Sequence, residues 1–458
     1  MKEHPTHKVL LSARGFLATN SSEDLVMCIY RFARARISGE YRVVVEEERL
    51  ERFARFITGL DDVKYAASGG IEAMLKKDKF DTVISAVPVT LRQALINCSV
   101  FIAKGKARFL RADLEKRLIS ETGFADIVRD IAKNMFSRPA LNSVLAALSR
   151  RLRLEKPLGT PRSLIIETVN MCNLKCPLCP TGTGSLGRTG ARMELSVFKK
   201  LVDSNLGVFL NTESIYMDFY GDPLMNRDIF GMIKYLKDKG AGHVEISTNA
   251  SFPLDERKAR EIVMSGVDLI LFAVDGADQE TYSRYRKGGD LSAVKEFIKG
   301  LVRMKKILGA VKPYLVLQFI LMKHNAHQLQ AAKEMAVVLG ADSFKIKFLD
   351  VFRSDGGDVE EFIPDDPGSA QYVKKADGYE HKRSTGNNTC GLLWSSAVIM
   401  VDGSVVPCCT DARGRVVLGN VFKRGIEHIW KGEKYRDLRR EIHRDKKAIP
   451  LCRDCPSQ

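Results

Sequence analysis

The chain has 458 residues, of which 45% are hydrophobic, and this length and composition predict about three globular domains. No apolar run reaches the roughly 18 residues of a transmembrane helix, and the N-terminal stretch lacks a secretory signal, so we expect a cytoplasmic protein. The net charge of +16 permits binding to nucleic acid, anionic lipid or a phosphorylated substrate, although such a charge also serves solubility alone.

The first part of the chain alternates short apolar runs with helix-like stretches, which is typical of a small α/β domain with a largely parallel sheet. The predicted strands are 8–12, 41–45, 63–66, 82–86 and 100–104, with helices at 22–35 and 91–98. Residues 111–155 turn helical and basic, and Pro157, Gly159 and Pro161 then break the pattern. We therefore predict a Rossmann-like N-terminal domain with a basic helical extension over residues 1–155.

A second alternation predicts a larger α/β domain over residues 160–365. The predicted strands are 163–168, 214–220, 243–248, 269–274, 314–321 and 343–348, and helices such as 196–204 and 291–308 lie between them. Six βα units predict a partial (β/α)6 TIM-like barrel whose loops at the strand C-termini carry the chemistry. Residues 351–389 predict a linker or lid, and residues 385–458 a short cysteine-rich module of a β-hairpin and helices.

Three cysteines, Cys172, Cys176 and Cys179, follow the first predicted barrel strand. Three thiolates on one short loop can hold three irons of a [4Fe–4S] cubane and leave the fourth iron open to a small molecule. Zinc with a fourth ligand from elsewhere is the alternative at this point.

The Cys-x3-Cys-x2-Cys spacing resembles the signature of the radical S-adenosylmethionine (SAM) superfamily, and segments after the next three strands resemble that family's SAM-binding segments. The family's Gly-Glu-Pro segment binds the methionine amino group, and this chain has Asp in place of Glu there. Leu178 stands where the family often has an aromatic residue. The resemblance thus implies a [4Fe–4S] cluster and SAM as cofactors. The residues it assigns to SAM binding are Gly221, Asp222, Pro223, Ser247, Asn249, Asp275 and Arg286.

A second cysteine group lies near the end of the chain and comprises Cys390, Cys408, Cys409, Cys452 and Cys455. Residues 397–408 predict a β-hairpin that turns at Asp402-Gly403 and brings Cys390 and Cys408 together. With Cys452 and Cys455 they form a four-thiolate site, which zinc also fits on geometry alone. The segment resembles the SPASM and twitch modules, and this implies one auxiliary [4Fe–4S] cluster, with Cys409 left over as a buried thiol or alternative ligand.

The resemblance implies reductive cleavage of SAM to a 5′-deoxyadenosyl radical that abstracts a hydrogen atom from the substrate. A single auxiliary cluster favours net oxidation of a sugar, cyclitol or nucleotide-linked substrate. Peptide modification, as in maturation of ribosomally made peptides, and a zinc-stabilised binding module are the alternatives.

The expected partners are a small-molecule or peptide substrate and an electron donor such as flavodoxin or ferredoxin, without a stable nucleic-acid partner. The N-terminal stretch lacks the Asp-x-His-x-x-Gly motif of cobalamin-binding domains, which disfavours cobalamin. The sequence leaves four candidates for a general base, namely Tyr220, Asp222, Lys347 and Asp350.

Overall fold

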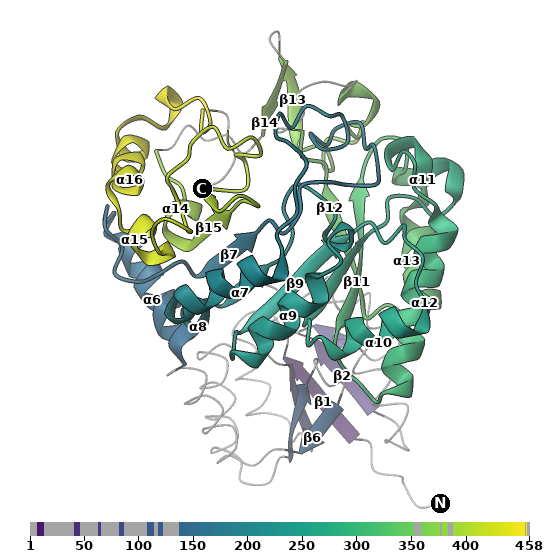
Figure 1. Cartoon of the computed structure of the whole chain (residues 1–458). Coiled ribbons are helices and arrows are strands. Elements are labelled where there is room, and N and C mark those ends of the chain that lie inside the picture. Colours follow the sequence, from purple (N-terminus) through teal and green to yellow (C-terminus); the bar gives the residue numbers. More distant parts are fainter. Residues whose placement is uncertain are drawn as a thin grey trace, which may run out of the picture. The chain divides into compact units, whose positions relative to one another are not determined.

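The computed structural model of the chain divides into two compact units, Met1–Phe136 and Ser137–Gln458 (Figure 1). The residues that it describes are 7–12, 41–45, 63–65, 82–86, 108–113, 118–121, 137–351, 359–375, 378–382, 388–453 and 455. The helices predicted at 22–35 and 91–98 and the strand predicted at 100–104 lie outside these residues.

The first unit contains a six-stranded sheet of order β3-β2-β1-β4-β5-β6. Neighbouring strands are parallel from β3 to β5, and β6 pairs antiparallel with β5. The order reverses between β1 and β4, as in a doubly wound α/β sheet. The strands are β1 (His7–Ser12), β2 (Tyr41–Val45), β3 (Val63–Tyr65), β4 (Thr82–Ala86), β5 (Arg108–Asp113) and β6 (Leu118–Glu121).

The second unit is built on a nine-stranded sheet of order β12-β11-β10-β9-β8-β7-β15-β16-β17. Six consecutive parallel strands, β7 to β12, form the predicted partial (β/α)6 barrel. The strands are β7 (Ser163–Ile166), β8 (Ser214–Tyr216), β9 (His243–Thr248), β10 (Leu269–Ala273), β11 (Tyr314–Leu321), β12 (Ser343–Phe348), β15 (Ser396–Ile399), β16 (Ser404–Val406) and β17 (Gly419–Asn420).

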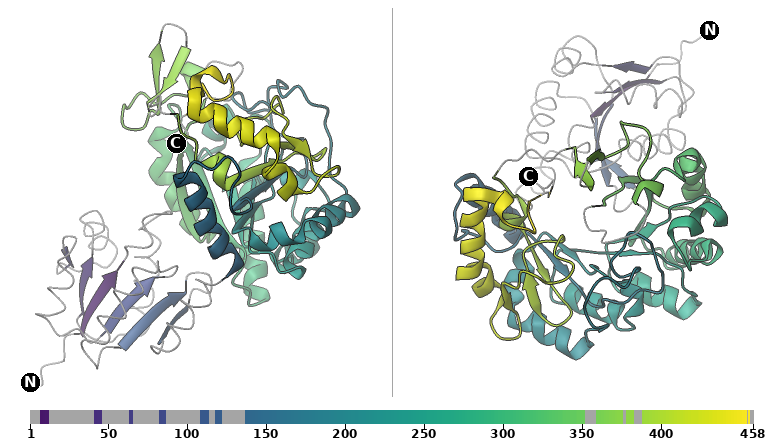
Figure 2. Two further views of the ribbon diagram at one scale, coloured as in Figure 1. Left: turned by 90° about the vertical axis from the view of Figure 1, so that its left-hand side faces the viewer. Right: turned by 90° about the horizontal axis from the view of Figure 1, so that it is seen from above.

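Helices cover one face of this sheet and lie on the outside of its curve (Figure 2). Every second strand residue, such as Ile215, Val244 and Phe272, packs beneath them in one apolar core. The α-helices are α6 (Arg138–Arg151), α7 (Leu195–Ser204), α8 (Leu206–Asn211), α9 (Ile229–Asp238), α10 (Glu256–Met264), α11 (Gln279–Tyr285), α12 (Leu291–Ile307), α13 (Leu329–Leu339), α14 (Leu392–Ser395), α15 (Ile426–Trp430) and α16 (Glu433–Asp445). Single 3₁₀ turns are η1 (Pro223–Met225), η2 (Ala326–Gln328), η3 (Val359–Glu361) and η4 (Lys446–Ala448).

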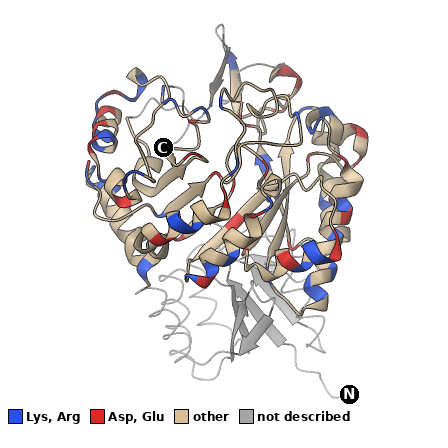
Figure 3. Cartoon of the chain, viewed as in Figure 1, with Lys and Arg blue, Asp and Glu red and all other residues tan. Residues whose placement is uncertain are grey.

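Acidic and basic residues are interspersed along the helices of this outer layer (Figure 3). Exposed ion pairs such as Lys234 with Asp238 and Lys258 with Glu261 lie within single helices. Each such pair stabilises its helix by only about 0.2–0.5 kcal/mol. None of the described helices is long and apolar enough to cross a membrane.

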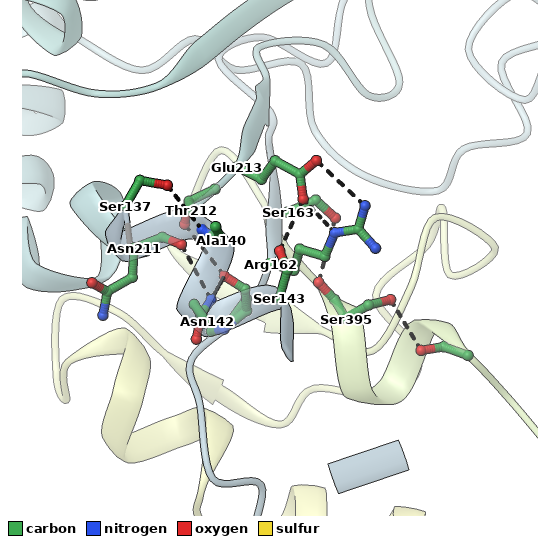
Figure 4. Close-up of polar contacts among 12 residues, drawn as sticks. Ser137, Ala140, Asn142, Ser143, Arg162, Ser163, Asn211, Thr212, Glu213 and Ser395 are labelled. Atoms are coloured by element: carbon green, nitrogen blue, oxygen red, sulfur yellow. Dashed lines mark hydrogen bonds and ion pairs between the residues drawn. The ribbon is translucent and has the colours of Figure 1, made fainter. Parts of the chain in front are cut away.

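Helix α6, the basic extension of the sequence analysis, lies in the second unit and docks on the start of the barrel (Figure 4). The Asn142 side chain donates to the carbonyl oxygens of Thr160 and Asn211 and accepts from the Thr160 amide. The next residue, Ser143, donates to Glu213, which also pairs with Arg162. These contacts join α6 to the segments that enter β7 and β8.

The predicted hairpin near the second cysteine group is present. Strand β15 pairs antiparallel with β16, and Gly403 turns between them at a φ of +80°. A feature not foreseen from the sequence is that β15 also pairs in parallel with β7, from Ser396 opposite Ser163 onward. The barrel sheet therefore continues without a break into the C-terminal module.

The segment predicted as a linker or lid contains secondary structure in its described part. A two-stranded hairpin, β13 (Tyr372–Lys375) with β14 (Gly378–His381), projects beyond the carboxyl ends of the barrel strands (Figures 1 and 2). The alternation that marks it is too short to distinguish it from polar loop in the sequence.

Candidate active site

The loop after β7 carries the first three cysteines at the carboxyl end of the barrel sheet. The Leu174 amide donates to the sulfur of Cys172 at 3.4 Å, and the Asn249 side chain lies 3.7 Å from the same sulfur. The Arg286 guanidinium approaches the sulfur of Cys176 at 3.8 Å. Donors aimed at sulfur stabilise thiolates, so the loop is arranged to hold negatively charged cysteines.

The protein alone disfavours the thiolate form of Cys172 and Cys176. Burial raises the pKa of Cys172 to about 12, and burial also raises the pKa of Cys176, although Arg286 opposes that rise. A bound iron cluster supplies the positive charge that offsets this penalty, since metal ligation requires the thiolate. Three neighbouring thiols whose charges repel one another fit a cluster that distributes them over separate irons.

No group of three His, Cys, Asp or Glu side chains within the described residues is placed to hold a single metal ion. The cysteine loop is thus read by its ligand type and spacing, which fit iron–sulfur ligation.

Gly221 and Asp222 connect the loop after β8 to the cysteine loop. A Cβ at Gly221 would lie 2.3 Å from the carbonyl oxygen of Val169, so only glycine permits this approach. The Asp222 amide donates to the carbonyl of Met171, directly before Cys172. Pro223, which is buried, follows as the first residue of the turn η1.

The carboxylate of Asp222 is occupied by groups of the protein itself. It accepts from the Thr248 hydroxyl at 2.9 Å, the Asn249 amide at 2.8 Å and the Leu224 amide at 3.0 Å. Burial outweighs these bonds and raises its pKa to about 6. The structure thus gives Asp222 a role in fastening the loops after β8 and β9, and its contact with a methionine amino group stays a prediction.

Ser247 and Asn249 lie at the end of β9, beside the cysteine loop. The Asn249 side-chain amide donates to the side-chain oxygen of Asn173 at 2.9 Å, one residue after Cys172. Both residues lie at the carboxyl end of β9, and their predicted ribose contacts stay predictions.

Asp275 and Arg286 form a buried ion pair at the end of β10. The Asp275 carboxylate accepts from the Arg286 Nε at 2.6 Å and from the Ile320 amide at 2.7 Å. Nearby carboxylate, thiol and phenol groups raise the pKa of Arg286 despite its burial. A fixed, permanently charged guanidinium next to Cys176 is suited to bind a carboxylate.

Leu178 replaces the expected aromatic residue and lies buried in an apolar cluster with Leu174 and Tyr285. It therefore contributes packing beneath the cysteine loop rather than ring stacking.

Sequence reasoning missed Asp218, two residues beyond β8. Its carboxylate accepts from the Ser247 amide at 3.2 Å. Burial, with the nearby Glu245 carboxylate, raises its pKa to about 7. Because every second residue of β8 and β9 points away from the helices, continuing that alternation past Tyr216 could have marked this side chain.

The second cysteine group gathers in the C-terminal module. Burial raises the pKa of the Cys452 thiol to about 12, and the nearby Cys390 and Cys455 contribute to that rise. Burial likewise raises the pKa of the Cys408 thiol to about 12, and the nearby Cys409 and Cys390 contribute to that rise. Cys390 thus influences both Cys408 and Cys452, and the assignment of the four cysteines as ligands of one cluster stays a prediction. Cys409 adjoins them, and its role as ligand or buried thiol stays open.

Buried Arg439 organises this module. Its guanidinium donates to the carbonyl oxygens of Leu393, Glu155 and Trp430 at 2.9 Å each. The rings of Trp430 and Tyr435 face it at 4.5 and 4.7 Å. The cation therefore ties α16 to the segments on both sides of the second cysteine group.

A partial barrel with three thiols on its first loop, joined to a second thiol-rich module, defines an iron–sulfur enzyme of the α/β-barrel class. Residues 166–317 match the family model of the radical SAM superfamily, and residues 390–456 match SPASM, an iron–sulfur cluster-binding domain. The chain is a radical SAM enzyme with a C-terminal SPASM domain, and its cofactors are [4Fe–4S] clusters and SAM. These matches therefore argue against the alternative interpretation of the chain as a zinc-stabilised binding module.

Two characterised relatives match most of their own length. The chain is 26% identical over 319 residues to the tungsten-containing aldehyde ferredoxin oxidoreductase cofactor-modifying protein of Pyrococcus furiosus, covering 64% of this chain and 86% of the relative. It is 23% identical over 299 residues to the SAM-dependent 2-deoxy-scyllo-inosamine dehydrogenase of Niallia circulans, covering 63% of this chain and 90% of the relative.

Among solved structures, SuiB of Streptococcus suis bound to SAM matches with a TM-score of 0.48 and 14% identity, covering 79% of this chain and 84% of SuiB.

Proposed function

We propose that this radical SAM enzyme oxidises a hydroxyl group of a sugar, cyclitol or nucleotide-linked substrate to a carbonyl. The observation that carries the proposal is the polar face of the barrel sheet turned away from the helices. On β9 this face presents His243, Glu245 and Ser247, all partly exposed, where a parallel strand of a closed core would carry apolar residues.

Two further strands of the same sheet, β11 and β12, also carry polar residues. Gln318 of β11 and Lys345 of β12 occupy paired positions in the register. Hydrogen-bonding groups on several strands suit a substrate with many hydroxyl groups, because each polar group of the site must find a partner. The likeness to a dehydrogenase of an aminocyclitol supports the same substrate class.

The residues around the cysteine loop are proposed to hold SAM. Arg286, fixed by Asp275, faces the methionine carboxylate, and Gly221 lets the backbone approach the ligand. Asn249 and Ser247 are placed for the ribose. When bound, the cofactors supply a 5′-deoxyadenosyl radical that removes a hydrogen atom from the substrate.

The test begins with anaerobic reconstitution and measurement of iron and sulfide. We expect about eight irons per chain, falling to about four when Cys172, Cys176 and Cys179 are replaced by Ala. The reconstituted enzyme is then incubated with SAM, a reductant and 2-deoxy-scyllo-inosamine or related sugars, and 5′-deoxyadenosine and the keto product are quantified. Flavodoxin and ferredoxin are the electron donors to compare with a chemical reductant.

A keto product formed in step with 5′-deoxyadenosine supports the proposal. Modification of a precursor peptide, with no turnover of any hydroxylated small molecule, would replace it with the peptide-modifying alternative.

A further inference from the structure

We propose that Asp218 is the residue that accepts the hydroxyl proton of the substrate during its oxidation, an inference that rests on the proposed function. Removal of a hydrogen atom from a carbon that bears a hydroxyl group leaves an O–H proton that must depart before the carbonyl can form. The barrel must therefore present a proton acceptor close to the bound SAM.

Asp218 lies between the two loops proposed to bind SAM. It precedes Gly221 by three residues on the loop after β8, and the Ser247 amide of β9 donates to its Oδ1 at 3.2 Å. The Met217 amide continues the pairing with β9 by donating to the Glu245 carbonyl. This pairing fixes the backbone of Asp218 at the strand edge.

The carboxylate also retains capacity to bind substrate. Within the described part of the chain, the Ser247 amide is the one hydrogen-bond donor to it, and the side chain is partly exposed. A carboxylate can accept about four hydrogen bonds, so Oδ2 has room for a substrate hydroxyl.

The four candidates from the sequence are less suited to this task. Asp222 already accepts from three protein donors, and Asp350 accepts from the Tyr372 hydroxyl at 2.6 Å. The Tyr220 ring is buried in a cluster with Leu186 and Ala412. Lys347 is an ammonium group, which donates but does not accept.

The surroundings adjust Asp218 for proton transfer near neutral pH. Burial raises its pKa to about 7, with further contributions from Glu245 and Asp222, while the Ser247 amide and Lys347 act in the opposite direction. Tyr216 of β8 adjoins these acids, and His243 pairs with Glu245 at 3.0 Å. A base whose pKa lies near the working pH is close to the optimum for general-base catalysis.

The proposed step balances in atoms and electrons. The substrate carbon loses its hydrogen atom to the 5′-deoxyadenosyl radical, and the hydroxyl oxygen loses its proton to the Asp218 carboxylate. The remaining unpaired electron leaves to a one-electron acceptor of the iron–sulfur class, and the carbon–oxygen double bond forms.

The test compares reconstituted wild-type enzyme, Asp218→Asn and the matched surface variant Asp238→Asn. Infrared spectra from about pH 5 to about pH 9 should show a protonated-carboxyl band that disappears with an apparent pKa of about 7 in wild type and Asp238→Asn. The band component with a pKa of about 7 should be missing from Asp218→Asn, in which the Asp222 carboxyl, with a pKa of about 6, still titrates. With 2-deoxy-scyllo-inosamine as the probe, Asp218→Asn should lose at least about 100-fold in keto product, while SAM binding by calorimetry stays within a factor of about 2.

The outcomes separate the two proposals. If wild type oxidises the probe and Asp218→Asn does so equally well, or if the band component with a pKa of about 7 survives in Asp218→Asn, the assignment of Asp218 is wrong and the proposed function stands. If wild type oxidises no hydroxylated substrate, the proposed function fails and the assignment fails with it, whatever the infrared titration shows.

Discussion

Arg188 and Glu167 form a bidentate ion pair, in which the two terminal guanidinium nitrogens donate to the two carboxylate oxygens at 2.7 and 2.6 Å. Glu167 follows β7 and Arg188 follows the cysteine loop, so the pair spans the base of that loop. Arg188 Nε also donates to the carbonyl of Ala412 at 2.9 Å, and Glu167 accepts from the Val401 amide at 3.1 Å. One buried pair thus connects the radical SAM barrel to the SPASM loop that follows Cys408.

Replacement of Arg188 by Met should destabilise the protein by about 3–5 kcal/mol, because the fully buried Glu167 carboxylate would lose its counter-charge. Chemical denaturation of the reconstituted enzyme measures the change. The control is Arg162→Met, which breaks a half-exposed pair with Glu213 and should cost about 1 kcal/mol or less. Equal losses in the two variants would contradict the structural role given to Arg188.

Replacement of Gly221 by Ala should abolish tight SAM binding. The added methyl group would meet the Val169 carbonyl at 2.3 Å and push apart the loop after β8 and the segment leading to Cys172. Isothermal titration with SAM is the measurement, on protein whose iron content has been checked. Gly207→Ala is the matched control, since a Cβ added there would meet no atom within 4 Å outside its chain neighbours and its own helix backbone, and Ala stabilises a helix by about 0.5–1 kcal/mol relative to Gly. Unchanged SAM affinity in Gly221→Ala would show that this close approach is unnecessary.

Replacement of Arg439 by Met should unfold or loosen the SPASM domain. Three backbone carbonyls would lose a charged donor in a buried setting, at about 3 kcal/mol or more in total. We expect the iron content to fall toward the level of a single cluster. Arg440→Met tests specificity, because the neighbouring Arg440 is half-exposed and its loss should leave the iron content unchanged. Retention of the full iron content by Arg439→Met would remove Arg439 from the support of the auxiliary site.

Much of the barrel could be predicted because its strands alternate clearly and end at turn residues. Strands 243–248, 314–321 and 343–348 were predicted with the bounds that the structure has. The predicted strands 163–168 and 214–220 extend beyond the observed ones, since β7 ends at Ile166 and β8 at Tyr216. The strand-like pattern of the sequence continues beyond both ends, although the chain has already left the hydrogen-bonded ladder there.

What the sequence could not show were relationships between distant segments. The parallel pairing of β15 with β7 leaves no local signature, because either strand could be an edge strand on its own pattern. The hydrogen-bond partners of Asp222 and the single described donor to Asp218 depend on which loops meet in space. Motif spacing therefore indicates Asp222 but not Asp218. Long-range contacts therefore add Asp218 to the four candidates for the base that the sequence leaves open, while the cysteine assignments stay predictions from spacing.

The last prediction concerns stability against pH. The pKa of Asp218 rises from 3.8 to about 7 on folding, so between these values the folded chain holds a proton that the unfolded chain has released. Stability from this group is therefore full below about pH 4 and is lost as the pH rises through about 7. Asp218→Asn cannot ionise, so its free energy of unfolding, relative to wild type, should increase across this window and level off above it. Urea denaturation of both proteins at a series of pH values measures the difference, in which other titrating groups such as Asp222 largely cancel. Parallel stability curves for the two proteins would mean that Asp218 ionises normally in the folded chain, and the proton acceptor would then have to be sought elsewhere on the barrel face.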